Sequence, residues 1–326
     1  MAKPKIALYW AASCGGCDVA VLDTNEKILD IANIVDIVFW PIAIDFKYHH
    51  VEAMEDGSID LCLFNGAVRN SEQEKIAKLL RAKSKVMVAF GACACFGGIP
   101  ALANFTNRDE IFERAYLQAP SNANANNIFP QTLTNDNGYK LELPEFFDTV
   151  STLAQVVDVD YFVPGCPPPV DIILKLVNLF ATGQLPPVGS VIASDKSLCD
   201  ECDRIKEDKK ITNIYRPHEI FPDPEKCLLE QGIICCGPAT RGGCGLRCIK
   251  VNMPCRGCFG PPPGIIDQGA KLVSAIASIY QGNEEDEIAM MVAEVLDPAG
   301  TFYRFGLADS MLKRKRLPQL QKEGIK

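Results

Sequence analysis

The segment from Cys227 to Cys258 constrains the fold of this chain more than any other. It reads CLLEQGIICCGPATRGGCGLRCIKVNMPCRGC, and it holds seven cysteines among many Gly and Pro residues. Fixing the backbone of each residue costs ~1–2 kcal/mol of conformational entropy, and a segment without long helices or strands recovers little of it through apolar packing. Gly and Pro let the backbone turn so that successive thiols can meet. We therefore expect covalent or coordinate bonds to hold this segment in place.

The overall composition is that of a globular protein that does not bind nucleic acid. The chain has 326 residues, 48% of them hydrophobic, which is enough for a large core and two domains. Its formal net charge of −8 argues against a nucleic-acid partner. The short run Lys313-Arg314-Lys315-Arg316 is an exception, and we expect it to be a solvated or partner-facing tail.

The sequence predicts a cytoplasmic location and no membrane span. No stretch approaches the ~20 apolar residues that cross a bilayer. The beginning, MAKPKIALYW, has neither a signal-peptide h-region nor a twin-arginine motif. In a reducing compartment, fifteen cysteines are expected to bind metal rather than to form disulfides.

Short apolar runs alternate with amphipathic stretches in the first half, and this pattern is typical of a doubly wound, flavodoxin-like parallel sheet. A helical spacing extends over 18–31, with Val21, Leu22, Ile28 and Leu29 on one side. The next helix is predicted at Ser71–Ala82, with Ser71 as its cap. Further helices are expected at about 170–181, 266–280 and 284–296. The predicted strands are Lys5–Trp10, Val35–Trp40, Ile59–Phe64, Lys85–Phe90 and Val159–Val163.

Two features divide the chain. The Asn-rich tract Pro120–Gly138 interrupts the alternation and is predicted to be a surface excursion that contacts a partner. Gln184-Leu-Pro-Pro ends a helix and marks a boundary. We therefore predict a flavodoxin-like domain over 1–183 and a cysteine-rich, mostly irregular domain with short helices over 184–326.

Four cysteines follow three of the predicted strands. Cys14 and Cys17 come after the first strand, Cys93 after the fourth and Cys166 after the fifth. Loops at the carboxyl ends of parallel strands converge on one crevice, so these thiols can meet at one point. Four thiolates suit a 4Fe-4S cluster or tetrahedral zinc. Their spread over some 150 residues favours a cluster, because zinc sites are usually built from compact knuckles.

A second group of nine cysteines lies between 199 and 258, and its spacing divides into two quartets. Cys-x-x-Cys pairs are a strong metal signal, although structural zinc is an alternative. Of the remaining cysteines, Cys62 is predicted to pack inside a strand, and Cys95 competes with Cys93 as a ligand. A flavin mononucleotide in the crevice is disfavoured by the cysteines there. The candidates are Cys199, Cys202, Cys227, Cys235 or Cys236, Cys244, Cys248, Cys255 and Cys258.

At this point the motifs resemble a known family, the small subunits of nickel-iron hydrogenases, and in particular the methyl-viologen-reducing, heterodisulfide-reductase-associated type of methanogens. The resemblance spans most of the chain in the same order. The matching motifs are SCGGC at 13–17, GACACFGG at 91–98, GCPPP at 165–169, CLLEQGIICCGPAT at 227–240 and MPCRGCFGPP at 253–262.

The resemblance implies three 4Fe-4S clusters in this chain and no catalytic centre of its own. Cys199 stands where many members have histidine, Cys235 matches the ligand of the C-x-G-P motif, and Cys248 lies near the corner that proline occupies in three-iron relatives. The implied proximal ligands are Cys14, Cys17, Cys93 and Cys166. The implied distal ligands are Cys199, Cys202, Cys227 and Cys235. The implied medial ligands are Cys244, Cys248, Cys255 and Cys258.

The resemblance also implies a function. The chain would relay electrons from the hydrogen-oxidising site of a separate large subunit to an acceptor such as a heterodisulfide reductase complex. A small iron-sulfur (delta) subunit is implied as a further partner. Asp18 follows Cys17 where the family often has glutamate, so it is a candidate for a proton route or a first-turn acid favoured by the helix dipole. The alternatives are the gamma subunit of a deazaflavin-reducing hydrogenase and a zinc-stapled assembly protein without redox activity.

Overall fold

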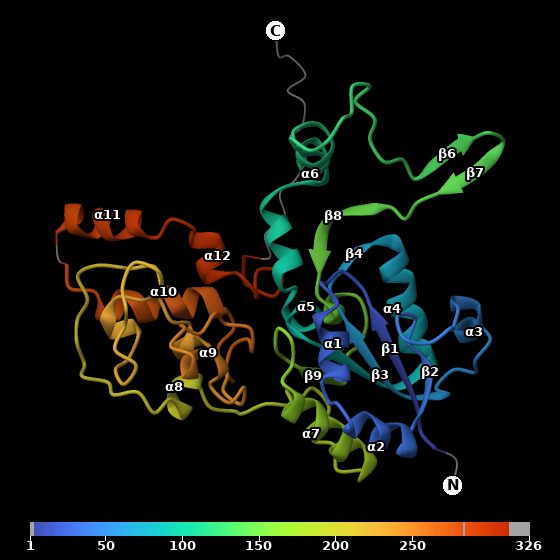
Figure 1. Ribbon diagram of the computed structural model, residues 1–326, viewed down its shortest axis with the longest axis horizontal. Helices are drawn as coiled ribbons and strands as arrows, with labels where there is room; N and C mark the ends of the chain where they lie inside the picture. The colour runs from blue at the N-terminus through green and yellow to red at the C-terminus, as the bar shows by residue number, and fades with distance from the viewer. Residues whose placement is uncertain (1–2, 283, 313–326) are drawn as a thin grey trace.

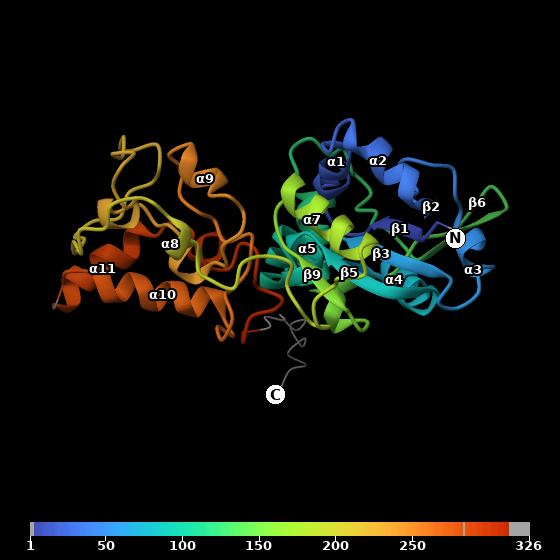
Figure 2. The ribbon, with the colours of Figure 1, turned by 90° about the horizontal axis from the view of Figure 1, so that it is seen from below.

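The computed structural model describes residues 3–282 and 284–312, which form two lobes (Figure 1, Figure 2). The first lobe is built on a parallel sheet, and the second is mostly irregular chain with short helices, as predicted. The run Lys313-Arg314-Lys315-Arg316 lies outside the described residues. None of the described helices is long and apolar enough to cross a membrane.

Five parallel strands form the main sheet, and their order confirms the predicted doubly wound architecture. Numbered among themselves, the strands run 2-1-3-4-5, which is the order of flavodoxin-like sheets. Each lies within about two residues of its predicted position, since a buried parallel strand is a short apolar run. From edge to edge they are β2 (Asp36–Phe39), β1 (Lys5–Trp10), β3 (Ile59–Asn65), β5 (Ser84–Phe90) and β9 (Tyr161–Val163).

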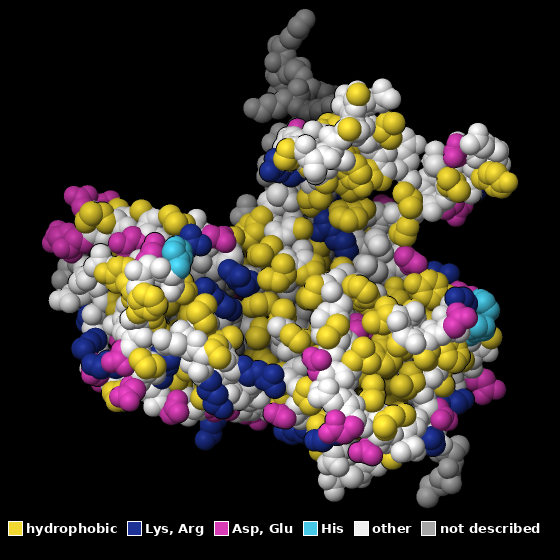
Figure 3. Space-filling model, viewed as in Figure 1, with side chains coloured by type: hydrophobic (Ala, Val, Ile, Leu, Met, Phe, Trp, Pro, Cys, Tyr) yellow, Lys and Arg dark blue, Asp and Glu magenta, His cyan; other side chains and the backbone are white. Residues whose placement is uncertain are grey.

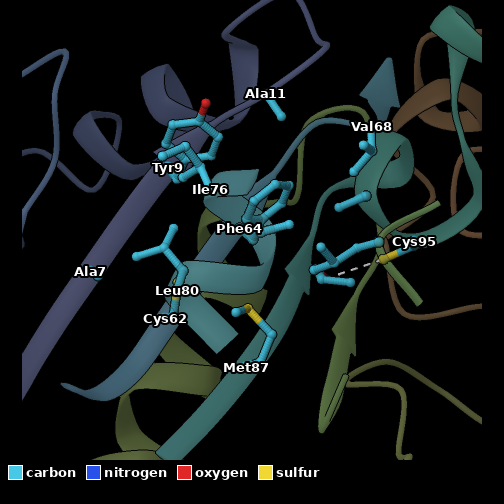
Figure 4. Close-up of a cluster of buried hydrophobic side chains, with 14 of the residues drawn as sticks. Ala7, Tyr9, Ala11, Cys62, Phe64, Val68, Ile76, Leu80, Met87 and Cys95 are labelled. Atoms are coloured by element: carbon cyan, nitrogen blue, oxygen red, sulfur yellow. Dashed lines mark hydrogen bonds between the residues drawn. The ribbon is translucent and has the colours of Figure 1, made fainter. Parts of the chain in front are cut away.

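Helices cover both faces of this sheet because side chains alternate along each strand. On one face, Cys62 of β3 lies in a buried cluster with Ile76 and Leu80 of α4 (Ser71–Lys83), as Figure 4 shows. The opposite face packs against α1 (Gly16–Leu22) and α7 (Val170–Ala181). Cys62 has no exposed surface, which confirms that it is a packing residue.

Two details of the predicted helices were wrong. The stretch predicted as one helix over 18–31 forms α1 and a separate α2 (Lys27–Ile34). The break comes where the hydroxyl of Thr24 donates to the carbonyl of Val21 and Asn25 takes a φ of +53°. In addition, the side chain of Asn70, not Ser71, caps α4 by accepting a hydrogen bond from the backbone N–H of Gln73.

The Asn-rich excursion is exposed, as predicted, and it forms part of an arm that we define as residues 118–145. The arm contains the hairpin β6 (Leu133–Asp136) and β7 (Tyr139–Glu142), whose eight residues are all exposed. It projects from the first lobe at the top right of Figure 1. At its base, the rings of Phe112 and Phe146 lie 5.2 Å apart.

The remaining elements of the first lobe are short connections. They are α3 (Tyr48–Glu52), β4 (Val68–Asn70), α5 (Ala92–Phe96), η1 (Ile99–Phe105), α6 (Arg108–Phe112), the single π-helical turn η2 (Glu113–Leu117), β8 (Phe146–Ser151) and η3 (Leu153–Gln155). Strands β4 and β8 form a separate antiparallel pair that the sequence pattern did not predict.

The second lobe has its own buried cluster, and cysteines are part of it. Cys235, Cys236 and Cys255 pack there with Leu272 and Ile276. The predicted helices at 266–280 and 284–296 correspond to α10 (Gln268–Ile279) and α11 (Glu285–Glu294). The short elements are α8 (Leu198–Glu201), η4 (Leu229–Gln231), η5 (Gly237–Ala239), α9 (Arg247–Lys250) and α12 (Pro298–Phe302).

After α12 the chain returns to the first lobe. Leu307 has no exposed surface, and it packs with Ala67, Ala101 and Val150, which belong to the first lobe. The side-chain amide of Gln155 donates to the carbonyl of Ala308 at 2.7 Å. The last described residues therefore complete the packing of the first half of the chain.

Candidate metal centres

The proximal set, defined as Cys14, Cys17, Cys93 and Cys166, comes together at the carboxyl edge of the sheet. Cys14 belongs to the turn after β1 and Cys17 to the first turn of α1. Cys93 lies in the short helix α5 that follows β5, and Cys166 in the turn after β9. The four thiols lie within electrostatic reach of one another. Burial raises the pKa of Cys93 to about 12, and nearby Cys166 and Cys14 add to the rise. A bound cation would favour the thiolates that this environment otherwise disfavours.

Gly91 leaves space for the sulfur atom of Cys17. Gly91 has a φ of +88°, and a Cβ on this residue would overlap the Sγ atom of Cys17. The backbone N–H of Gly91 donates to the carbonyl of Val163 at 2.8 Å, which joins the turns after β5 and β9. The close approach of backbone to sulfur is the reason that Gly occupies this position.

A hydrogen-bonded hub at the end of β3 fixes the turn that carries Cys14 and Cys17. The side-chain oxygen of Asn65 accepts from the Ser13 hydroxyl at 2.8 Å, and its amide nitrogen donates to the carboxylate of Asp18. The other oxygen of that carboxylate accepts from the indole N–H of Trp40 at 2.8 Å. Asp18 is only 1% exposed. Its burial raises the pKa of the carboxyl group, and the two hydrogen bonds oppose that rise.

The distal set, defined as Cys199, Cys202, Cys227 and Cys235, lines one cavity of the second lobe. A Cβ on Gly237 would lie 3.0 Å from the Sγ atom of Cys199 and 3.6 Å from that of Cys235, so a glycine again leaves space beside the sulfurs. Burial raises the pKa of Cys199 to about 12, and Cys235, Cys227 and Cys202 contribute to the rise.

The medial set, defined as Cys244, Cys248, Cys255 and Cys258, lines a second cavity of about 210 Å³. Cys166 of the proximal set lines the same cavity, and its backbone forms a hydrogen bond that lowers the pKa of the Cys258 thiol. The backbone N–H of Cys255 donates to the Sγ atom of Cys235 at 3.4 Å. The medial set therefore lies between the proximal and distal sets, with a direct contact to each.

The cysteines outside these sets are held in the protein core. The thiol of Cys95 donates to the carbonyl of Ala89 at 3.2 Å (Figure 4). Cys236, next to Cys235, is buried in the second lobe and does not line the distal cavity. All fifteen cysteines lie in the described part of the chain, and none of them forms a disulfide bond.

The donor chemistry fits iron-sulfur clusters. Each set supplies four thiols, and thiolates are the usual protein ligands of such clusters. Among the described residues, no group of three or more Cys, His, Asp or Glu side chains converges as the ligands of one metal ion would. In the medial and distal sets, the thiols instead surround cavities.

Residues 14–180 match the family model described as the NADH ubiquinone oxidoreductase 20 kDa subunit. The iron-sulfur subunit (G) of the F420-non-reducing hydrogenase of Archaeoglobus profundus is 43% identical over 95% of this chain and 98% of its own length. The corresponding G subunit of the F420-non-reducing hydrogenase of Methanothermobacter thermautotrophicus is 36% identical over 99% of both chains.

Among solved structures, a chain of the NiFeSe hydrogenase from Desulfovibrio vulgaris Hildenborough superposes with a TM-score of 0.51. The match covers 86% of this chain and 99% of that chain, at 18% sequence identity. At this identity the likeness concerns the fold.

Proposed function

We propose that this chain, which belongs to the hydrogenase small-subunit family of the F420-non-reducing hydrogenase G subunits, is the electron-transfer subunit of a nickel-iron hydrogenase. One observation carries the proposal. Three sets of four thiols stand in a row, and backbone hydrogen bonds join Cys166 to Cys258 and Cys255 to Cys235. Such a row suits transfer between neighbouring centres, while hydrogen oxidation belongs to a separate subunit.

Three 4Fe-4S clusters fit the donor sets, held by the proximal, medial and distal cysteines as defined above. When bound, such clusters supply one-electron transfer. Within the medial set, Cys248 supplies the fourth thiol, because it lines the same cavity as Cys244, Cys255 and Cys258. The hydrogen bond between the Cys95 thiol and Ala89 favours Cys93 as the proximal ligand.

The protein itself holds and shields the centres. Backbone N–H groups that donate to ligand sulfurs stabilise negative charge there. For Asp18 we propose an anchoring role rather than a proton route, because Trp40 and Asn65 already donate to its two carboxylate oxygens. The pairing fixes the first turn of α1 against the sheet, and with it the positions of Cys14 and Cys17.

The proposed partner at the proximal end is the nickel-bearing large subunit. Cys14 and Cys166 are exposed, so a partner must cover them to exclude water. Figure 3 shows hydrophobic side chains gathered over the first lobe and on the arm. On β7 and just beyond it, Tyr139, Leu141 and Leu143 are 72%, 49% and 55% exposed. These three residues lie at every second position, so their side chains share one face of the strand. We propose that this face binds the large subunit.

The proposed acceptor binds near the distal set. Lys206 lines that cavity and is exposed, so it can contact an acidic partner. The relatives are described as F420-non-reducing, which favours a heterodisulfide reductase complex, reached through a small iron-sulfur (delta) subunit, over a deazaflavin acceptor. We also propose a cytoplasmic location for the assembly and a domain boundary at 183/184 in this chain.

Anaerobic purification of the chain with its partners, followed by metal analysis, tests the proposal. We expect a brown complex with about twelve iron atoms per copy of this chain, in addition to the metals of the large subunit. A colourless chain with stoichiometric zinc would contradict it and support the zinc-stapled alternative. Co-purification of a nickel-containing chain would establish the class of partner.

A further inference from the structure

One arginine lies among the medial ligands. Arg256 stands between Cys255 and Cys258 in the sequence, and it lines the medial cavity together with all four medial cysteines. The other described residues that line this cavity carry no formal charge apart from the thiols; they are Leu198, Thr240, Leu246, Ile249, Phe259 and Phe305. Among the described residues that line the cavity, Arg256 is therefore the one with a positive charge.

In the described part of the chain, Arg256 forms no ion pair with a carboxylate. Arg256 also lines a neighbouring cavity that holds Glu294 and Asp297. These two carboxylates accept hydrogen bonds from backbone groups instead: the N–H of Ile214 donates to Glu294 at 2.6 Å, and the N–H of Gly300 donates to Asp297 at 2.8 Å.

Arg304 shares the neighbouring cavity but does not line the medial one. Its Nε–H group donates to the carbonyl of Gly300 at 2.8 Å. Of the two arginines, Arg256 is therefore the one that lines the medial site.

We propose that Arg256 raises the reduction potential of the medial centre. The inference rests on the proposed function. Reduction adds one electron, and so one negative charge, to the centre, and a nearby cation stabilises the reduced form more than the oxidised form. This stabilisation is larger inside a protein than in water, because the surroundings screen the charge less. Net charge near a cluster is one of the factors that set its potential.

A consequence concerns the direction of electron flow. A higher medial potential favours transfer of an electron from the proximal centre to the medial one. By raising the medial potential, Arg256 makes the medial centre a better acceptor for electrons from the proximal end.

A redox titration of the intact complex, monitored by electron paramagnetic resonance, tests this role. We expect Arg256→Gln to lower the midpoint potential of the medial signal and Arg256→Lys to leave it near the wild-type value. Arg304→Gln should lower it by a smaller amount. Lys250→Gln is the matched control, since Lys250 is an exposed cation of α9 that lines neither cavity.

An unchanged medial potential in Arg256→Gln, with the iron content retained, would overturn the inference. So would a shift of equal size in Lys250→Gln. If Arg256→Gln loses the medial iron, Arg256→Met is tested in its place, because its longer side chain fills more of the same space without a charge. An unchanged medial potential in that variant overturns the inference. Absence of any medial signal from the wild-type complex would instead count against the proposed function.

Discussion

The backbone N–H of Cys255 lies 3.4 Å from the Sγ atom of Cys235 and donates a hydrogen bond to it. The two residues belong to different thiol sets, so a single backbone hydrogen bond connects the medial and distal sites. The C-x-G-P motif of the second lobe is thereby linked to the C-R-G-C motif. Each site is built partly by the loop of its neighbour.

The two adjacent cysteines of the C-x-G-P motif should differ in their effect on metal content. We expect Cys235→Ala to lose about four iron atoms per chain, because Cys235 lines the distal cavity. Cys236→Ala is the matched control and should retain all the iron, since Cys236 packs in the lobe's core. Iron analysis of the two purified variants checks this. Iron loss in the Cys236 variant alone would reverse the assignment.

Gly91 is predicted to be essential for the proximal site. In Gly91→Ala the new Cβ would overlap the Sγ atom of Cys17, so we expect loss of about four iron atoms per chain. Gly189→Ala is the control: its φ is +89°, nearly the same as the +88° of Gly91, but no atom lies within 4 Å of a Cβ there. This control should lose about 1–2 kcal/mol of stability and keep its iron. Equal iron loss in both variants would mean that backbone strain alone is responsible.

The hub residue Asn65 should hold the first cysteine turn. Asn65→Ala removes partners from both Ser13 and Asp18, and it leaves a buried carboxylate with one donor fewer. We expect the free energy of unfolding to fall by about 2 kcal/mol. The proximal signal should also broaden in electron paramagnetic resonance spectra. Thermal unfolding together with these spectra is the test, and an unaltered proximal signal would show that the turn is positioned without Asn65.

The arm should contribute to binding the large subunit through one face only. Leu141→Glu places a charge on the apolar face of β7, and we expect the affinity for the large subunit to fall by about 2 kcal/mol, or about thirtyfold. Lys140→Glu is the control, because its side chain points to the opposite face of the same exposed strand. Quantitative co-purification measures both. Equal losses would point to net charge rather than to the apolar face.

Removal of the iron should affect the two lobes differently. Under oxidising conditions with a chelator, we expect amides in 199–258 to lose protection from hydrogen exchange, because metal binding is coupled to folding where regular structure is sparse. Amides of β3 and β5 should stay protected, since these strands lie in an apolar core without ligands between them. Hydrogen exchange read by mass spectrometry distinguishes the two regions. Uniform protection after iron loss would show that the second lobe folds without metal.

Much of this fold follows from local patterns. The strands ending at Trp10, Phe90 and Val163 are short apolar runs, and cysteines appear directly after each of them. Parallel topology then brings those cysteines to one edge. The arm's hairpin was not predicted, because its strands are exposed and gain little from burial.

Some site residues could not be found from motifs. Asn65 could have been singled out by one feature of the sequence: it is a polar residue at the end of the mostly apolar strand IDLCLFN. The break between α1 and α2 depends on the Thr24 hydroxyl and the positive φ of Asn25, whereas the apolar spacing continues through it. Arg256 lies inside a recognised motif, but its importance depends on which cavity it lines, and only the folded chain shows that.

The return of the chain to the first lobe has a consequence for biosynthesis. Leu307 and Ala308 complete a cluster with Ala67 and Ala101, so a core begun early in translation waits for residues that are made much later. A nascent chain cannot finish this region before Leu307 and Ala308 have emerged from the ribosome. Capture by the large subunit is therefore expected only after these residues are available, and a chain truncated before residue 305 should be cleared by proteolysis before it can join an assembly.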